Sequence, residues 1–374
     1  MHYLNNKKEK MKMTKTILTI GLILFVIAGQ IAYGQTNKEK ALAKGQDAVK
    51  LMDNGKIEES IKLLEEAQKL DPERIDYPYE LAYAYFLKED YNKVIEILEK
   101  NIEHKDVNER LFQLLGNCYD ILGKSDKAID VYDAGLKKFP NSGMMYLEKG
   151  NVYLGKKEYG KSLSNYEKGI EVNPEFPSNY YRAAKIFCGS SEEVWGMIYG
   201  EIFMNLERNS KRTAEISKLL YDTYKSEIKF TSDTSFSVSF SENASIIIDQ
   251  LKDSSNMKLP FGVGVYEPTL ILSMIGEKSI DINSLARIRK NFVVAYYQNG
   301  NDKKYPNILF DYQNKILEAG HLEAYNHWIL MKGDEDGFNK WYSANKEKFD
   351  NFMKWFADNG LKVDNSNKFY SGQY

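Results

Sequence analysis

Small and apolar residues repeat along the first half of the chain at an interval of 34 residues, starting at Ala41. The eighth residue of successive units is small: Ala48, Ala82, Gly116, Gly150 and Ala184. The eleventh is large and apolar or aromatic: Leu51, Tyr85, Tyr119, Tyr153 and Phe187. Turn residues such as Gly55 and Gly123 separate the two helices within a unit, and proline closes three of the units: Pro72, Pro140 and Pro174. The pattern predicts two helices per unit, and the units must stack because none can bury its apolar face alone.

These features resemble the tetratricopeptide repeat (TPR). The units lie near residues 41–74, 75–108, 109–142 and 143–176, with a degenerate continuation over 177–208, so we expect a TPR domain over residues 35–208. The resemblance implies helical hairpins that coil into a superhelix, whose inner groove is lined mainly by the first helix of each unit. It also implies a protein or peptide partner bound in that groove, without catalysis.

By the family's pattern, the second, fifth, ninth and twelfth residues of a unit face the groove. The candidate binding residues are Tyr79, Tyr83, Phe86, Arg110, Gln113, Asn117, Leu147, Asn151, Tyr181 and Lys185. Asn117 and Asn151 share one groove position, and an amide both donates and accepts, so the two could bond to the main chain of an extended peptide. They could equally be solvated polar residues. The aromatic candidates suggest binding, or packing against a neighbouring unit or the C-terminal domain.

The 34-residue register is lost after about residue 208, and we expect a separate, mostly helical domain over residues 209–374. Apolar spacing predicts helices over 210–227, 281–298, 306–319, 321–331 and 336–359. Residues 229–240 alternate like one half-buried strand, and a partner strand is expected around 262–266. No family resemblance covers this half. The predicted fold class is therefore mainly α, with a small β element.

The first 34 residues have the pattern of a signal peptide. Five lysines precede an apolar run over residues 17–28, and the small residues Ala32 and Gly34 suit a cleavage site after Gly34. We therefore expect a periplasmic or secreted protein, and the pattern is equally compatible with a location at the cell surface. After cleavage we expect no membrane span. A retained membrane anchor over residues 17–33 is the alternative. Translation could start at Met1, Met11 or Met13.

Composition narrows the classes of function. The 374 residues are 43% hydrophobic and 28% charged, which is typical of an ordered globular protein. The formal net charge is −2, and loss of the first 34 residues would bring it near −6, so we expect no nucleic-acid partner. The oligomeric state is left open.

We expect no cofactor, no metal and no catalytic residue. Gly123-Lys124-Ser125 resembles the end of a phosphate-binding loop, but Cys118 stands where that loop needs glycine. His321 and His327 are six residues apart and so cannot form the paired site that a spacing of four would give. The alternative function is binding or hydrolysis of a glycan or small ligand by the C-terminal domain. The aromatic side chains whose flat faces could bind a sugar there are Tyr296, Tyr297, Trp328, Trp341 and Trp355.

The two cysteines, Cys118 and Cys188, lie in repeat units that are two apart in the sequence. Packed helices lie roughly 8–10 Å apart, whereas a disulfide needs Cα atoms within about 7 Å. We therefore expect two separate thiols, even though an exported protein with two cysteines would otherwise suggest a disulfide.

Overall fold

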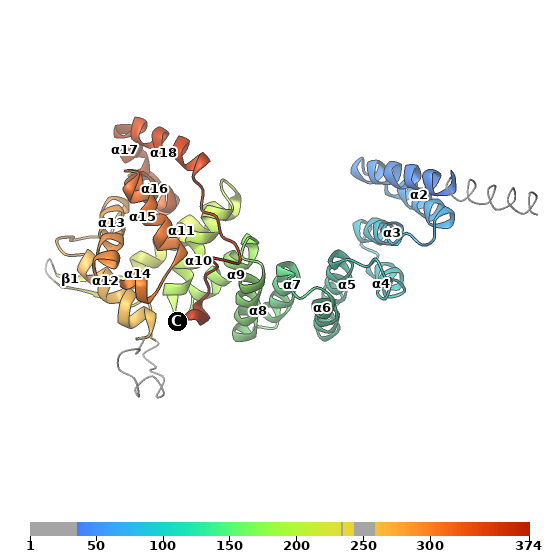
Figure 1. Cartoon of the computed structure of the whole chain (residues 1–374), viewed down its shortest axis with the longest axis horizontal. Coiled ribbons are helices and arrows are strands. Elements are labelled where there is room, and N and C mark those ends of the chain that lie inside the picture. Colours follow the sequence, from blue (N-terminus) through green and yellow to red (C-terminus); the bar gives the residue numbers. More distant parts are fainter. Residues whose placement is uncertain (1–35, 233–234, 243–258) are drawn as a thin grey trace, which may run out of the picture. The chain divides into compact units, whose positions relative to one another are not determined.

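The computed structural model describes residues 36–232, 235–242 and 259–374 (Figure 1). The described chain is mainly α-helical with one two-stranded sheet, which confirms the predicted fold class. It divides into two compact units, Met1–Val131 and Tyr132–Tyr374. The expected signal peptide and its alternative, a membrane anchor, lie outside the described residues. Within the described ranges, no helix combines the length and apolar character needed to cross a membrane.

The first unit consists of helical hairpins in the predicted register. Its helices are residues 36–53, α2 (Ile57–Leu70), α3 (Asp76–Leu87), α4 (Tyr91–Glu99), α5 (Glu109–Ile121) and the first half of α6 (Ser125–Lys138). Gly55 and Gly123 adopt φ of 75° and 71°, a conformation that glycine reaches without steric cost. Asp90 and Asn108 cap α4 and α5 by accepting hydrogen bonds from backbone N–H groups.

The second unit continues the hairpins with α7 (Gly143–Gly155), α8 (Tyr159–Val172), α9 (Pro177–Phe187) and α10 (Glu193–Leu206). Gly150 shows why the eighth position is small. A Cβ atom at this position would lie 2.4 Å from Cε1 of Tyr166, which packs across from it. Ala184 is fully buried at the equivalent position of the next hairpin. The small-residue pattern therefore marks the closest contacts between helices.

Helix α11 (Lys211–Glu227) begins 34 residues after α9 and packs on it. Two contacts between these helices join residues exactly one repeat length apart: Arg212 Nη1 donates to Ser178 Oγ at 3.0 Å, and Tyr181 OH donates to Glu215 at 2.5 Å. Ser210 caps the start of this helix, where its side chain accepts a hydrogen bond from the Thr213 N–H. A domain boundary at residue 208 stays a prediction.

The remaining elements lie in the second unit and are mostly helical. They are β1 (Ile228–Ser232), β2 (Ser235–Val238), the π-helical turn η2 (Gly262–Tyr266), α12 (Glu267–Ser273), α13 (Ile282–Gln298), α14 (Asn301–Lys304), α15 (Ile308–Glu318), α16 (Leu322–Leu330), α17 (Glu335–Ala344), α18 (Lys346–Asp358) and the 3-10 turn η3 (Ser371–Gln373). Helices α11, α13, α15 and α16 confirm four of the predicted helices.

The predicted single strand over residues 229–240 is wrong, because the segment forms the antiparallel pair β1 and β2. Phe230 pairs with Phe236 across the hairpin, with ring centroids 5.6 Å apart. Since apolar residues alternate through both strands, the periodicity alone does not reveal the turn. The expected partner strand at 262–266 is also wrong: this segment is helical, and a short apolar run does not distinguish the two.

The single helix predicted over 336–359 is likewise wrong. Two helices, α17 and α18, meet at Asn345. Its side-chain Nδ2 donates to the carbonyl oxygen of Trp341 at 2.9 Å. Asparagine offers the backbone an alternative to continued helix, and the apolar spacing on either side conceals the break.

One aromatic-rich core joins the last repeat helices to the rest of the second unit. Residues 361–374 run back along the repeats. Lys368 Nζ donates to the carbonyl oxygen of Glu171 at 2.8 Å, and the Ser371 N–H donates to Tyr199 OH at 2.7 Å. Phe369 is buried in this core beside Tyr199.

Candidate functional site

In the first unit, apolar side chains are exposed at predicted groove positions. Tyr83 on α3 is 39% exposed, and its ring stacks on Phe86 with centroids 6.3 Å apart. Leu42 and Val49, at the second and ninth positions of the preceding hairpin, are 40% and 38% exposed. Tyr79 is half-buried on the same helix as Tyr83. These five residues are called the apolar face below.

Charged and polar groups from α3 and α5 accompany the apolar face. Arg110 is exposed, and Gln113 and Asn117 are half-buried. Burial, and after it the neighbouring Asp76, raise the pKa of Glu80, while Arg110 opposes that rise. The pKa of Tyr79 is raised by burial and by Glu80. Tyr79, Glu80 and Arg110 therefore form an interacting group.

The predicted groove residues of the second unit are engaged within their own unit. Asn151 accepts a hydrogen bond from Tyr166 OH at 2.9 Å, and its Nδ2 donates to Glu148 at 3.0 Å. Leu147 packs against the hydrophobic core. Tyr181 is only 8% exposed, because α11 lies against it. These contacts leave less of each side chain available to a partner than the repeat pattern alone suggests.

A pocket of about 480 Å³ lies between the end of α7, the start of α8 and α9. We call it the α7–α9 pocket; it is lined by Leu154, Tyr159, Arg182, Lys185, Ile186, Gly189 and Ser190. The family pattern places two lining residues, Leu154 and Lys185, at groove positions, and the other five lie between or beyond those positions. The signal available in the sequence was the aromatic residue Tyr159 at the start of α8, whose side chain is exposed in the structure.

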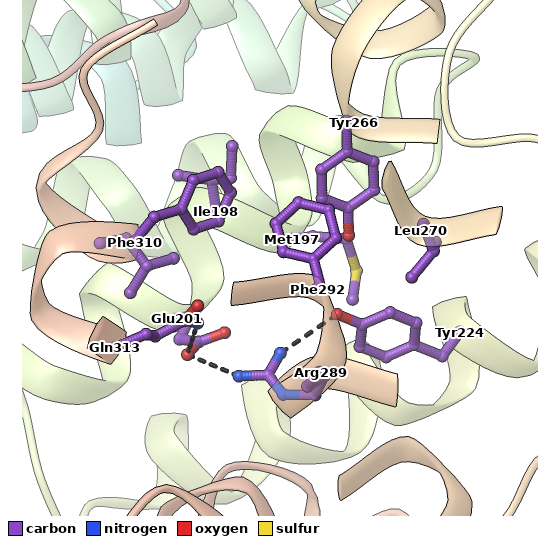
Figure 2. A pocket seen from close by; sticks show the side chains of 11 residues that line it. Met197, Ile198, Glu201, Tyr224, Tyr266, Leu270, Arg289, Phe292, Phe310 and Gln313 are labelled. Atoms are coloured by element: carbon purple, nitrogen blue, oxygen red, sulfur yellow. Dashed lines mark hydrogen bonds and ion pairs between the residues drawn. The ribbon is translucent and has the colours of Figure 1, made fainter. Parts of the chain in front are cut away.

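A buried polar cluster lies at the centre of the second unit (Figure 2). Glu201 Oε1 on α10 accepts hydrogen bonds from three other helices: from Arg289 Nη2 at 2.7 Å, Gln313 Nε2 at 2.6 Å and Tyr325 OH at 2.8 Å. Arg289 also donates to Tyr224 OH at 3.1 Å. Glu201 and Arg289 are only 2% and 7% exposed. We call these five residues the Glu201 cluster.

The geometry of the Glu201 cluster favours a structural role. The adjoining cavity measures about 20 Å³, enough for a water molecule and far below the roughly 300 Å³ of a typical ligand site. Burial lowers the pKa of Arg289, but the Glu201 carboxylate more than offsets this, so the net shift is upward and the Arg289 guanidinium stays charged. The signal for this cluster in the sequence was a single glutamate inside the apolar run of α10. Helical periodicity alone does not show why a charged residue stands there.

The structure places most of the proposed sugar-binding faces inside the core. Tyr296, Trp328 and Trp341 are buried, while Tyr297 and Trp355 are half-buried. Over the part of the chain that the structure describes, no three His, Cys, Asp or Glu side chains are grouped so as to hold a metal ion.

Both cysteines are free thiols, as the repeat register predicts. Cys118 is buried, and Cys188 is partly buried against Gly196. Burial raises the pKa of each thiol to about 12.

Comparison with known proteins supports the repeat assignment. Residues 53–135 match the family described as anaphase-promoting complex, cyclosome, subunit 3, and residues 145–176 match the tetratricopeptide repeat family. The TPR repeat-containing protein YpiA of Bacillus subtilis is 30% identical over 38% of this chain and 33% of its own length. The Hsp70-Hsp90 organizing protein of Triticum aestivum is 22% identical over 58% of this chain and 36% of its own length. The chain thus spans about a third of these curated relatives.

A solved structure of Pseudomonas aeruginosa pilF is 19% identical and covers 51% of this chain and 86% of that one, with a TM-score of 0.44. The two family matches fall where the structure shows paired helices in a 34-residue register. The paired helices in the first half of the chain are therefore tetratricopeptide repeats.

Proposed function

We propose that the protein is an exported, non-enzymatic scaffold that holds a protein or peptide partner on the first helices of its repeats. The observation that carries this proposal is the apolar face, where Leu42, Val49 and Tyr83 are each more than a third exposed in one compact unit. Stacked repeats create extended binding surfaces of this kind. One relative, the Hsp70-Hsp90 organizing protein, is named for organising two other proteins.

The apolar face has the features of a preformed binding surface. The Tyr83 ring is supported by its stack on Phe86, so little side-chain freedom remains to be lost on binding. Each 100 Å² of apolar area covered by a partner would contribute about 2.5 kcal/mol before the costs of association. Arg110, Gln113 and Asn117 on α5 supply polar groups that would fix the orientation of a bound chain.

The test is selection of a phage-displayed library of random dodecapeptides on the full chain. We expect enriched peptides whose binding weakens 5-fold to 30-fold in the Tyr83→Ala variant, corresponding to about 1–2 kcal/mol. Ile275→Ala is the control, because Ile275 is 73% exposed in the other compact unit. Failure to enrich any peptide, or equal binding by both variants, would refute the proposed binding face.

The export part of the proposal rests on the lysine-rich start, the apolar run and the small residues Ala32 and Gly34. Intact-mass analysis of the chain recovered from the exported fraction of its native host should give an N-terminus at Gln35. Recovery of chains that retain residues 17–34 would make the protein membrane-anchored instead.

A further inference from the structure

The α7–α9 pocket is a second binding feature, separate from the apolar face and contained within one compact unit. Its volume of about 480 Å³ lies within the range of ligand sites in proteins, about 300–1,000 Å³. Leu154, Tyr159 and Ile186 provide an apolar wall, and Tyr159 is 52% exposed. The pocket can therefore receive a large apolar side chain.

The charged residues that line the pocket are both basic. Arg182 and Lys185 both line it, and none of the described lining residues is acidic. Lys185 Nζ is already paired with Glu215 at 2.5 Å, so its charge is largely compensated. The Arg182 guanidinium lies 5.8 Å from the centroid of the Tyr181 ring, and no carboxylate among the described residues lies within ion-pair distance of it. Glu215 lies close enough for the Arg182 charge to help lower its pKa, after the larger contributions of Lys185 and Tyr181. Among the described residues, however, Glu215 makes its direct ion pair with Lys185, so the Arg182 guanidinium beside the apolar wall can still pair with an acid of a partner.

We propose that the α7–α9 pocket binds a peptide segment in which a large aliphatic or aromatic side chain lies next to an acidic side chain. The apolar side chain would occupy the wall formed by Leu154, Tyr159 and Ile186, and the carboxylate would pair with Arg182. A guanidinium offers a planar pair of donors that matches a carboxylate, which makes arginine selective for this group. This inference rests on the proposed scaffold function and names the chemistry of the partner.

The experiment is a selection that isolates peptides specific to the pocket. A random dodecapeptide library whose peptides have no free C-terminus is first depleted on the full-length Arg182→Glu variant and then selected on the unaltered chain. We expect the enriched peptides to carry Asp or Glu beside Leu, Ile, Phe or Trp. Because the library presents no free carboxyl terminus, the acidic group must be a side chain.

Matched variants then test the contact directly. An enriched peptide should bind at least tenfold more weakly to Arg182→Glu and to Ile186→Glu, as measured by fluorescence anisotropy. Lys290→Glu makes the same charge reversal on an exposed face of α13 and should leave binding unchanged. The same peptide with Lys in place of its acid should bind Arg182→Glu better than the unaltered chain. That rescue requires a folded variant, so loss of fold does not explain the result.

Two outcomes separate this inference from the proposed function. If the depleted selection yields nothing while peptides that depend on Tyr83 are still enriched, the pocket inference fails and the scaffold function stands. If neither selection yields a peptide, both fail. Enriched peptides without acidic residues, or equal binding to Arg182→Glu and Lys290→Glu, would also overturn the pocket inference.

Discussion

The Glu201 cluster gives the sharpest prediction about stability. Replacing Glu201 with Met keeps a side chain of similar volume but removes the acceptor of three hydrogen bonds and the carboxylate that pairs with Arg289. Removing one partner of a buried ion pair typically costs about 3–5 kcal/mol, because the other charge stays buried without compensation. We therefore expect Glu201→Met to lower the free energy of unfolding of the second unit by about 4 kcal/mol.

The double variant Glu201→Met/Arg289→Met tests the cause of that loss. Since it removes both charges from the core, it should be more stable than the Glu201→Met single variant, although it has one more substitution. All four tryptophans lie in the second unit, so tryptophan fluorescence during urea unfolding follows this unit specifically. Glu347→Met is the control, because Glu347 is exposed on α18.

Two results would refute this reasoning. A loss below about 1 kcal/mol in Glu201→Met would mean that the charge of Arg289 is compensated in another way. If the double variant loses more unfolding free energy than the two single variants lose together, the two residues do not act as an ion pair.

Three further predictions follow from individual contacts. Gly150→Ala should lower the midpoint of thermal unfolding, with a loss of about 1–3 kcal/mol from the close approach of a neighbouring ring, whereas Gly160→Ala, which meets open space, should not. Burial lowers the pKa of His327 below 6.5, so on acidification the unfolded chain takes up this proton first, and the free energy of unfolding should fall as the pH drops below about 7. His327→Gln should make that fall shallower when the free energy is measured by urea unfolding at several pH values. An unchanged dependence of the free energy on pH would contradict this prediction. Cys118 and Cys188 should react slowly with iodoacetamide at pH 8 in the folded protein and rapidly after unfolding, as read by intact mass, because burial keeps both thiols protonated; fast labelling of the folded chain would contradict this.

The repeat part of the fold could be predicted because its contacts recur at a fixed spacing. The small residue at Gly150 and the ring of Tyr166 meet in the structure as the 34-residue pattern implies. The break at Asn345 could not be predicted in this way, since the apolar residues on both sides keep helical spacing while one side-chain amide ends the helix. Helical periodicity reports which face is buried, not where the backbone changes direction.

Prediction of the candidate sites from the sequence is limited even more than prediction of the fold by contacts between distant parts of the chain. Tyr83 was predictable, because its position in the repeat leaves it exposed. Tyr181 has the same kind of position, but α11 covers it, and the sequence of α11 shows no small residue at the eighth place of a further unit. Arg289 meets Glu201 across 88 residues of chain, a separation that no local pattern encodes.

The return of residues 361–374 to the repeats has a consequence for the order of folding. A repeat array is usually held by contacts between neighbours, so it can open from a free end one hairpin at a time. Here Lys368 bonds to Glu171 across 197 residues and Ser371 to Glu167 across 204. Such contacts close very long loops and form late, after the helices between them are in place. We therefore expect the hairpin of α7 and α8 to complete its packing only after the chain beyond α18 has docked, and to unfold together with that core.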